Sequence, residues 1–335
     1  MNAKNYMSIE NTNALKGIMA IMVLISHIYA SSSFQINIPA LNFVFGSFLG
    51  YVPVSVFFFL SGYGTMFSFR KKGVEYVRLL PRNRLLPLYL ISLVMISIYS
   101  LVDLLINKNL DVILLLKSLA LGGTVIKYGW YLQTIIVLYV LFWVCFSLRI
   151  RDNLKILVFC VSVGVLYVSS FALGFEPTWY ATAPCMMIGM LWSVFADRVD
   201  RIINTHLKKW ISIIASLLIC ALFKISSTLL SGNIAYLFQL TGTSIFFSIA
   251  IILFLKGISL CNFITRFLGK ISLEIYVTQG LTIILLSFWG LHKINIFLYG
   301  LLVVAATILL AISVHPIFNK INKGVRKDYK IKREG

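Results

Sequence analysis

The sequence predicts an all-α membrane protein with about ten transmembrane helices and both termini in the cytoplasm. Three observations support this fold class. Apolar residues make up 59% of the 335-residue chain, the mean hydropathy is +0.92, and charged residues contribute only 12%. These values lie outside the range of ordinary soluble domains. The apolar runs also recur at the length that crosses about 30 Å of hydrocarbon, so the lipid bilayer is the expected environment.

About ten apolar segments are long enough to span the membrane. They cover residues 14–31, 44–69, 85–106, 129–148, 154–173, 178–196, 210–230, 235–255, 271–290 and 295–318. The apolar stretch at 112–123 is too short to cross, so we predict that it is interfacial or re-entrant. A cleaved signal peptide over residues 1–30 is the alternative for the first segment. Glu10 in its leading region and the apolar chain that follows favour a retained first helix.

The basic residues predict the orientation of the helices. The net charge is +19, and an inside N-terminus places most of the 30 Lys and Arg residues in the inner segments. The exceptions are Lys108, Lys117, Lys127, Lys224 and Lys293. This asymmetry follows the positive-inside rule, and the basic loops lack interleaved aromatics, so no nucleic-acid partner is expected. Residues 320–335 are interpreted as a basic cytoplasmic tail that faces lipid headgroups.

The first apolar helix carries two polar residues on one face. Lys16 and His27 are eleven residues apart, which on an α-helix is three turns plus about 20°, or roughly 16 Å along the axis. We expect Lys16 at the inner boundary and His27 inside the bilayer, where an ionisable side chain marks a candidate site. The alternatives are an interfacial anchor and a neutral structural histidine. No role is predicted for His206, His292 or His315, which lie in loops or at expected helix ends.

Polar residues on or near the segments at 44–69, 85–106 and 129–148 are further candidates. Arg82 and Arg84 precede the segment at 85–106, where they are either topology signals or contacts for an anionic ligand. Ser61 lies in a Leu-Ser-Gly-Tyr context without a nucleophile-elbow motif, which favours close helix packing. Trp130 and Gln133 open the segment at 129–148 at its outer end, and an aromatic belt explains the tryptophan but leaves the glutamine unexplained.

The late helix at 271–290 contributes another group of polar residues. Glu274 is four residues after Lys270, so an i,i+4 ion pair between them is favoured over catalysis. Ser272, Tyr276 and Gln279 fall on one side of this helix and form a polar stripe that is expected to face a cavity. Metal binding is not predicted, because no His or carboxylate pair has ligand spacing and the five cysteines lack CxxC motifs.

Five segments match the motifs of a known family in the same order along the chain. They are Asn13-Ala14-Leu15-Lys16 with His27, Phe58-Phe59-Leu60-Ser61-Gly62-Tyr63, the set Arg82, Arg84, Pro87 and Tyr89, Trp130-Tyr131-Leu132, and the stretch from Phe267 to Tyr276. With these motifs the chain resembles the acyltransferase-3 family, integral-membrane enzymes of bacteria that O-acetylate surface polysaccharides and related acceptors. Asn13 stands where the family often has aspartate and Leu273 where it often has tyrosine. Gln279 stands where many members have histidine, which places more weight on His27.

The resemblance implies a single acyltransferase domain over residues 1–335 in the inner (cytoplasmic) membrane, with no bound cofactor and acyl-CoA, usually acetyl-CoA, as co-substrate. The acceptor would be a hydroxyl of a surface or exopolysaccharide sugar or of its lipid-linked precursor. His27 would be the catalytic base or a transient acyl carrier. The donor would bind Lys16, Arg82 and Arg84. Residues that would line the acceptor cavity are Ser61, Trp130, Gln133, Glu274, Tyr276 and Gln279. A transporter or flippase for a lipid-linked sugar, or a non-catalytic subunit of polysaccharide assembly, remains the alternative.

Overall fold

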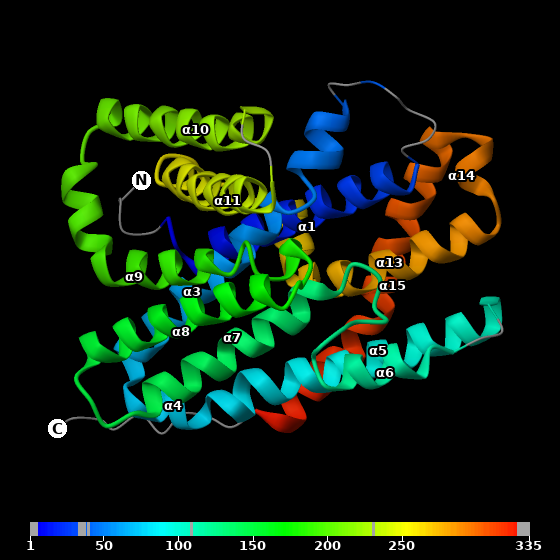
Figure 1. The fold of residues 1–335 in the computed structure, drawn as a ribbon, viewed down its shortest axis with the longest axis horizontal. Helices are drawn as coiled ribbons and strands as arrows, with labels where there is room; N and C mark the ends of the chain where they lie inside the picture. The colour runs from blue at the N-terminus through cyan, green and yellow to red at the C-terminus, as the bar shows by residue number, and fades with distance from the viewer. Residues whose placement is uncertain (1–5, 33–37, 39–40, 108–109, 230–231, 327–335) are drawn as a thin grey trace. The chain divides into compact units, whose positions relative to one another are not determined.

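The computed structural model describes residues 6–32, 38, 41–107, 110–229 and 232–326, and every regular element in these ranges is a helix (Figure 1). Among the described residues, nine helices are long and apolar enough to span a membrane. The number is ten when a bent pair of helices, Phe263–Lys270 and Ser272–Phe288, is counted as one span. The predicted class, a helical membrane protein with about ten spans, is confirmed. The side of the membrane on which the termini lie stays a prediction.

The helix bounds agree with most of the predicted segments. The long helices are α1 (Ile9–Ser31), α3 (Val52–Lys72), α5 (Leu86–Asn107), α7 (Trp130–Ser147), α8 (Asp152–Ala172), α9 (Pro184–Ile202), α10 (His206–Leu229), α11 (Asn233–Leu255), α13 (Ser272–Phe288) and α15 (Ile296–Val325). The shorter elements are η2 (Asn42–Phe48), α4 (Val74–Leu80), η3 (Pro81–Leu85), α6 (Val112–Leu119), η4 (Pro177–Trp179), α12 (Phe263–Lys270) and α14 (Leu291–Ile294). The stretch at 112–123 yields only the eight-residue α6, which is too short to cross a bilayer.

The second predicted helix, at 44–69, begins later than expected. The segment Asn42–Phe48 forms a separate wide helical turn, and α3 starts at Val52 with Pro53 in its first turn. Proline has no amide hydrogen, so it fits the first turn of a helix and not its interior. Hydropathy alone could not locate this break, because the residues on both sides of it are apolar.

The basic segment at 70–84, which lies between two predicted spans, is mostly helical. Gly73 turns the chain with φ 59°, a left-handed conformation that favours glycine. Val74–Ile106 then forms one long helical stretch. Within it Pro81 lacks an amide hydrogen, and the amide of Leu86 bonds to the carbonyl of Pro81 across a wide π-helical turn. Hydropathy does not predict a helix at 70–84 because the segment is basic, although Arg favours helices.

Packing divides the chain into two units. Unit 1 comprises Met1–Ala20, Gly50–Lys71 and Cys160–Lys270, and unit 2 comprises Ile21–Leu49, Lys72–Phe159 and Ile271–Gly335. In unit 1, α10 and α11 lie side by side (Figure 1). Gly242 permits this contact, since a Cβ atom there would come within 2.3 Å of the Phe223 ring. A small residue lets two membrane helices approach closely.

The contact between α3 and α9 in unit 1 depends on two glycines. A Cβ atom on Gly62 would lie 2.0 Å from the carbonyl oxygen of Met186, and a Cβ atom on Gly189 would lie 2.0 Å from that of Phe59. Each helix therefore presents a glycine to the backbone of the other. This reciprocal contact agrees with the predicted packing role of the segment around Ser61.

The start of α1 packs on α12 through a second glycine pair in unit 1. A Cβ atom on Gly17 would come within 2.6 Å of the backbone nitrogen of Gly269. A Cβ atom on Gly269 would lie 2.2 Å from the carbonyl oxygen of Asn13. Two segments that carry the family resemblance, far apart in the sequence, are thus direct neighbours.

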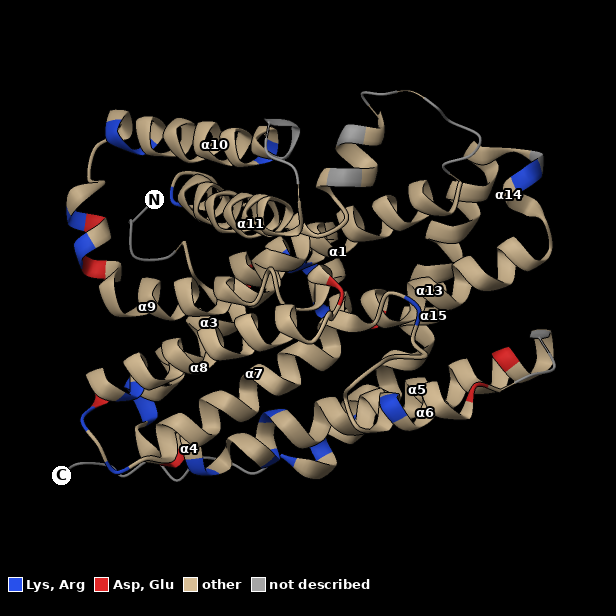
Figure 2. Ribbon diagram, in the orientation of Figure 1, with Lys and Arg blue, Asp and Glu red and all other residues tan. Residues whose placement is uncertain are grey.

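Unit 2 is built around contacts of α13 with α15 and α5. The hydroxyls of Thr282 and Thr307 share a hydrogen bond of 2.7 Å between α13 and α15. The hydroxyl of Tyr99 on α5 donates to the carbonyl of Val277 on α13 at 3.1 Å. In Figure 2 the blue of Lys and Arg gathers along α4 and the residues that lead from it into α5, whereas α7 is tan along its length. The two contacts of Thr282 and Tyr99 are hydrogen bonds of hydroxyl and carbonyl groups in the buried parts of these helices.

Candidate active site

His27 is a buried side chain in unit 2, as the sequence predicts. It lies on α1 and is only 8% exposed. The side chain of Gln279 on α13 lies beside the imidazole. Nδ1 of His27 and Oε1 of Gln279 are both buried and have no hydrogen-bond partner among the described residues. The Gln279 amide nitrogen donates to the carbonyl of Tyr276 at 3.0 Å, which leaves Oε1 as an acceptor for an N–H of the imidazole.

A tyrosine covers one face of the His27 ring. The rings of His27 and Tyr128 are stacked, with centroids 3.7 Å apart and planes within 7° of parallel. Tyr128 belongs to the connection between α6 and α7 and has φ 65°, a left-handed conformation that is rare for residues other than glycine. Such backbone conformations persist only where the surrounding structure holds them in place, and they gather at functional sites.

The connection that carries Tyr128 is held against α13. The hydroxyl of Tyr276 donates to the carbonyl of Tyr128. Gly280 makes room for the neighbouring backbone, since a Cβ atom there would lie 2.5 Å from the carbonyl oxygen of Lys127. From α7 the buried Gln133 donates through Nε2 to the carbonyl of Gly123. Two residues predicted to line a cavity, Tyr276 and Gln133, thus shape the loop over His27.

Lys127 brings a positive charge to this loop. Its Nζ atom lies 5.5 Å from the centre of the Tyr128 ring, within the range of a cation–π contact. The ammonium group also acts electrostatically on His27. Burial lowers the pKa of the Lys127 amine from its ordinary value. The histidine therefore has a cationic neighbour as well as a neutral carboxamide.

Glu274 pairs with a histidine and not with Lys270, so the predicted ion pair is wrong. Its Oε1 lies 2.6 Å from Nδ1 of His315 on α15. The helical break at Ile271, between α12 and α13, removes the continuous geometry that an i,i+4 pair requires. Nε2 of His315 is 2.8 Å from the Asn319 amide nitrogen. The sequence analysis dismissed His315 as a helix end, but α15 continues through the following proline to Val325.

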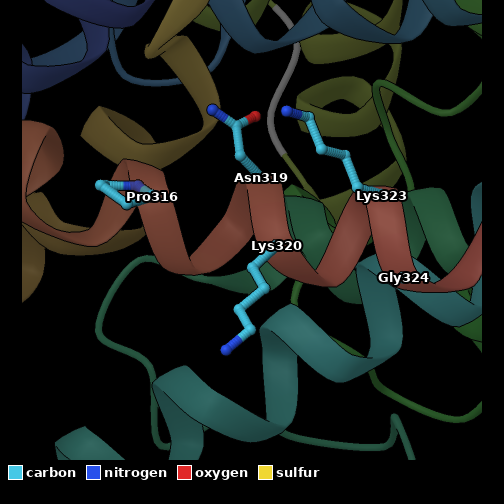
Figure 3. Close-up of a pocket in the computed structure, with 5 residues that line it drawn as sticks. All are labelled: Pro316, Asn319, Lys320, Lys323 and Gly324. Carbon is cyan, nitrogen blue, oxygen red and sulfur yellow. The ribbon is translucent and has the colours of Figure 1, made fainter.

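The end of α15 forms a basic hollow of about 610 Å³. Its lining residues are Pro316, Asn319, Lys320, Lys323 and Gly324. In Figure 3 Asn319 and Lys323 project on one side of α15, and Lys320 projects on the other. Nε of Arg82 donates to the carbonyl of Val325 at 2.7 Å, a favourable position for a cation at a helix C-terminus. The predicted tail thus begins inside α15, and residues 327–335 lie outside the described residues.

In unit 2 the structure places Gln279 beside His27, and Tyr276 and Gln133 bond to the loop that carries Tyr128. It places the other predicted residues as follows. Lys16 lies on α1, which is unbroken from Ile9 to Ser31, so its spacing of roughly 16 Å from His27 along the helix holds. Ser61 lies on α3 in unit 1, where its carbonyl accepts from the Thr65 hydroxyl. Trp130 is half-buried at the start of α7, and Arg84 lies with Arg82 in η3.

Tyr128 and Lys127 were not predicted as neighbours of His27. A basic and an aromatic residue next to Trp130, after two glycines at 122–123, were the available signal. This pattern does not predict that the loop lies near His27, because their contact depends on how the loop folds back against α13. Among the described residues, no group of three or more His, Cys, Asp or Glu side chains could hold a metal ion.

These features define a membrane-spanning helical protein with a buried histidine that packs against a tyrosine ring and a glutamine side chain. A family model for an acyltransferase domain, that of the acyltransferase-3 family, matches residues 9–315, nearly the whole chain. The chain belongs to this family, as the motifs predicted, and the protein is thus a membrane acyltransferase. Comparisons with curated proteins and with solved structures find no match.

Proposed function

We propose that this acyltransferase moves an acetyl group from acyl-CoA to a hydroxyl of a surface polysaccharide or exopolysaccharide sugar, or of its lipid-linked precursor, in the bacterial inner membrane. The observation that carries the proposal is the buried His27, which lies between the ring of Tyr128 and the carboxamide of Gln279. An ionisable group inside a membrane helix is costly and is retained for function. An imidazole is also the commonest proton acceptor in acyl transfer.

Gln279 gives His27 the tautomer that a general base needs. In this mechanism the carboxamide beside the imidazole accepts the N–H of one ring nitrogen, which leaves the lone pair of the other nitrogen for the acceptor hydroxyl. As the hydroxyl oxygen bonds to the thioester carbon, its proton moves to that second nitrogen. The carbon–sulfur bond then breaks, and the CoA thiolate takes that proton to leave as the free thiol. The imidazole ends the cycle neutral.

The donor binds through positive charges at the inner ends of the helices. Lys16, Arg82 and Arg84 contact its phosphates, for which arginine offers paired donors. Lys320 and Lys323 add charge near Arg82, whose side chain bonds to the end of α15. The spacing of roughly 16 Å between Lys16 and His27 is comparable to the length of a pantetheine arm, which would carry the thioester to the imidazole.

The acceptor approaches from the opposite side of the membrane. Trp130 offers an aromatic face for a sugar ring, and Gln133 and Tyr276 shape the loop that adjoins His27. Ser61 and Glu274 are the remaining candidates for the cavity wall, Ser61 in unit 1 and Glu274 in unit 2.

The function is tested with purified protein in liposomes, radiolabelled acetyl-CoA and an extracted surface glycan. We expect label in the glycan, together with free CoA that forms only when the acceptor is present. Movement of the glycan across the bilayer without consumption of acetyl-CoA would identify a transporter instead.

The same experiment distinguishes the two possible roles of His27, general base and acyl carrier. A general base leaves the protein unlabelled when the acceptor is omitted. Label on the His27 peptide under that condition would show an acyl-imidazole intermediate.

Replacement of Lys16 by alanine is expected to raise the apparent KM for acetyl-CoA about tenfold and to leave kcat near the parental value. Loss of one charge-assisted contact to a phosphate weakens binding on this order. The measurement is an initial-rate titration with acetyl-CoA. Lys293→Ala, an exposed cation in α14, serves as the control and should not change KM. An unchanged KM for Lys16→Ala would remove this residue from the donor site.

A further inference from the structure

The contact between Tyr128 and His27 is closer to parallel than most aromatic pairs. Aromatic rings generally prefer offset or edge-on arrangements, with centroids 4.5–7 Å apart. Here the centroids are 3.7 Å apart and the planes differ by 7°. The phenol ring therefore covers the imidazole face almost completely, and any rotation of the imidazole about its own bonds would drive it into the tyrosine.

The backbone conformation of Tyr128, which produces this contact, is held in place by neighbouring residues. Tyr128 has φ 65°, which disfavours a bulky side chain. Three features keep it there: the Tyr276 hydroxyl bonds to its carbonyl, Gly280 admits the adjacent Lys127 backbone, and Gln133 ties down the loop at Gly123. The surrounding structure thus supplies the energy that the backbone conformation costs.

One helix fixes the imidazole from two directions. Gln279 of α13 lies at the ring edge. Tyr276, three residues earlier on the same helix, holds Tyr128 against the ring face. The amide nitrogen of Gln279 also donates to the Tyr276 carbonyl, so the edge and face contacts share a common support. A rigid support of this kind holds a reacting group in its productive orientation.

The phenol hydroxyl has no acid–base part in this arrangement. Burial raises the pKa of Tyr128 to about 12, so the side chain stays protonated at physiological pH. Lys127 lies over the same ring, and its charge is drawn to the electron-rich face and not to the hydroxyl. The part of Tyr128 that matters for His27 is therefore the flat face of its ring.

We propose that Tyr128 is a positioning residue: its ring fixes the plane of the His27 imidazole, so that one edge of the imidazole stays beside the Gln279 carboxamide and the nitrogen that takes the proton stays available to the acceptor hydroxyl. The effect on rate rests on the proposed function, whereas the effect on the ring orientation does not. The proposal requires an aromatic ring at position 128 but no hydroxyl.

Kinetics of two variants test the requirement for a ring. Tyr128→Phe keeps the stacked face and should acylate at close to the parental rate. Tyr128→Leu keeps an apolar side chain without a flat face, and its kcat should fall at least tenfold with little change in either KM. Tyr139→Leu, at a buried tyrosine of unit 2 on α7, controls for a general loss of packing. A Phe variant as slow as the Leu variant, or a Leu variant with parental kcat, would overturn the proposal.

Chemical labelling tests the orientation of the ring without an activity assay. Diethylpyrocarbonate acylates accessible imidazole nitrogens, and peptide mass spectrometry reports the labelled fraction of His27. Tyr128→Leu should raise the labelling rate of His27 severalfold, whereas Tyr128→Phe and Tyr139→Leu should not. The exposed His206 provides an internal reference for reagent dose. Equal labelling of His27 in the Leu variant and the wild type would overturn the proposal, even if His27 proved unnecessary for acyl transfer.

Discussion

Replacing His27 with alanine is expected to lower acyl transfer by about 10²–10⁴-fold, the range that general acid–base groups contribute. The alanine side chain cannot take the proton of the acceptor hydroxyl, and water cannot replace it at a side chain that is only 8% exposed. The measurement is the initial rate at which label from acetyl-CoA appears in the acceptor. KM for the donor should change little, since the phosphate contacts remain.

A second histidine variant tests whether the loss of rate is specific to His27. His206→Ala removes an exposed imidazole at the start of α10 and should keep the parental rate. The thermal unfolding midpoint of His27→Ala in detergent should stay close to that of the wild type, which separates lost chemistry from lost fold. Retention of the parental acylation rate by His27→Ala would remove the imidazole from the mechanism.

Gly62→Ala is expected to destabilise the protein by about 1–3 kcal/mol, the usual cost of overpacking. The added methyl group would meet the Met186 carbonyl oxygen at 2.0 Å, and this oxygen belongs to the backbone of α9. A backbone atom cannot move aside as a flexible side chain can, so α3 and α9 must separate. The thermal unfolding midpoint, measured in detergent, reports the loss.

Gly64→Ala is the control on the same helix. A Cβ atom on Gly64 meets no atom within 4 Å, and alanine is the better helix former. This variant should unfold at or slightly above the parental temperature. Equal midpoints for the two alanine variants would show that α3 and α9 are not in close contact at Gly62.

The sequence predicted the helical class because hydropathy and length are properties of single segments. Each span needs about 20 apolar residues, and that requirement can be read without knowledge of its neighbours. The predicted helix bounds differ from the structure where a single proline or glycine changes the backbone conformation within an apolar or basic segment. Pro53 delays the start of α3, and Gly73 turns the chain between α3 and α4. Both residues can be read in the sequence, but their effect on where a helix begins or ends depends on how the flanking helices pack.

The candidate site could be predicted in part. His27 and Gln279 stand out in the sequence as polar residues within apolar helices, and the structure places them side by side. Tyr128 could not be found in this way, because its importance arises from a loop that returns to another helix. The pair of Glu274 and His315 was missed for a related reason, since 41 residues separate its members.

The glycine contacts give the family motifs a physical meaning. Gly17 follows the Lys16 motif, and Gly269 lies in the late motif of the resemblance, yet the two backbones touch. A side chain at either position would force α1 and α12 apart. These motif positions therefore serve packing, whereas His27 on the same helix serves the chemistry in our proposal.

The most direct test of the central claim is the release of free CoA thiol by purified protein in liposomes, with and without acceptor. Wild type and His27→Ala are measured side by side with the same acetyl-CoA. The wild-type protein should release one thiol for each acylated acceptor, and His27→Ala should release thiol about 10²–10⁴-fold more slowly. Acceptor-dependent thiol release by His27→Ala at the wild-type rate would contradict the claim.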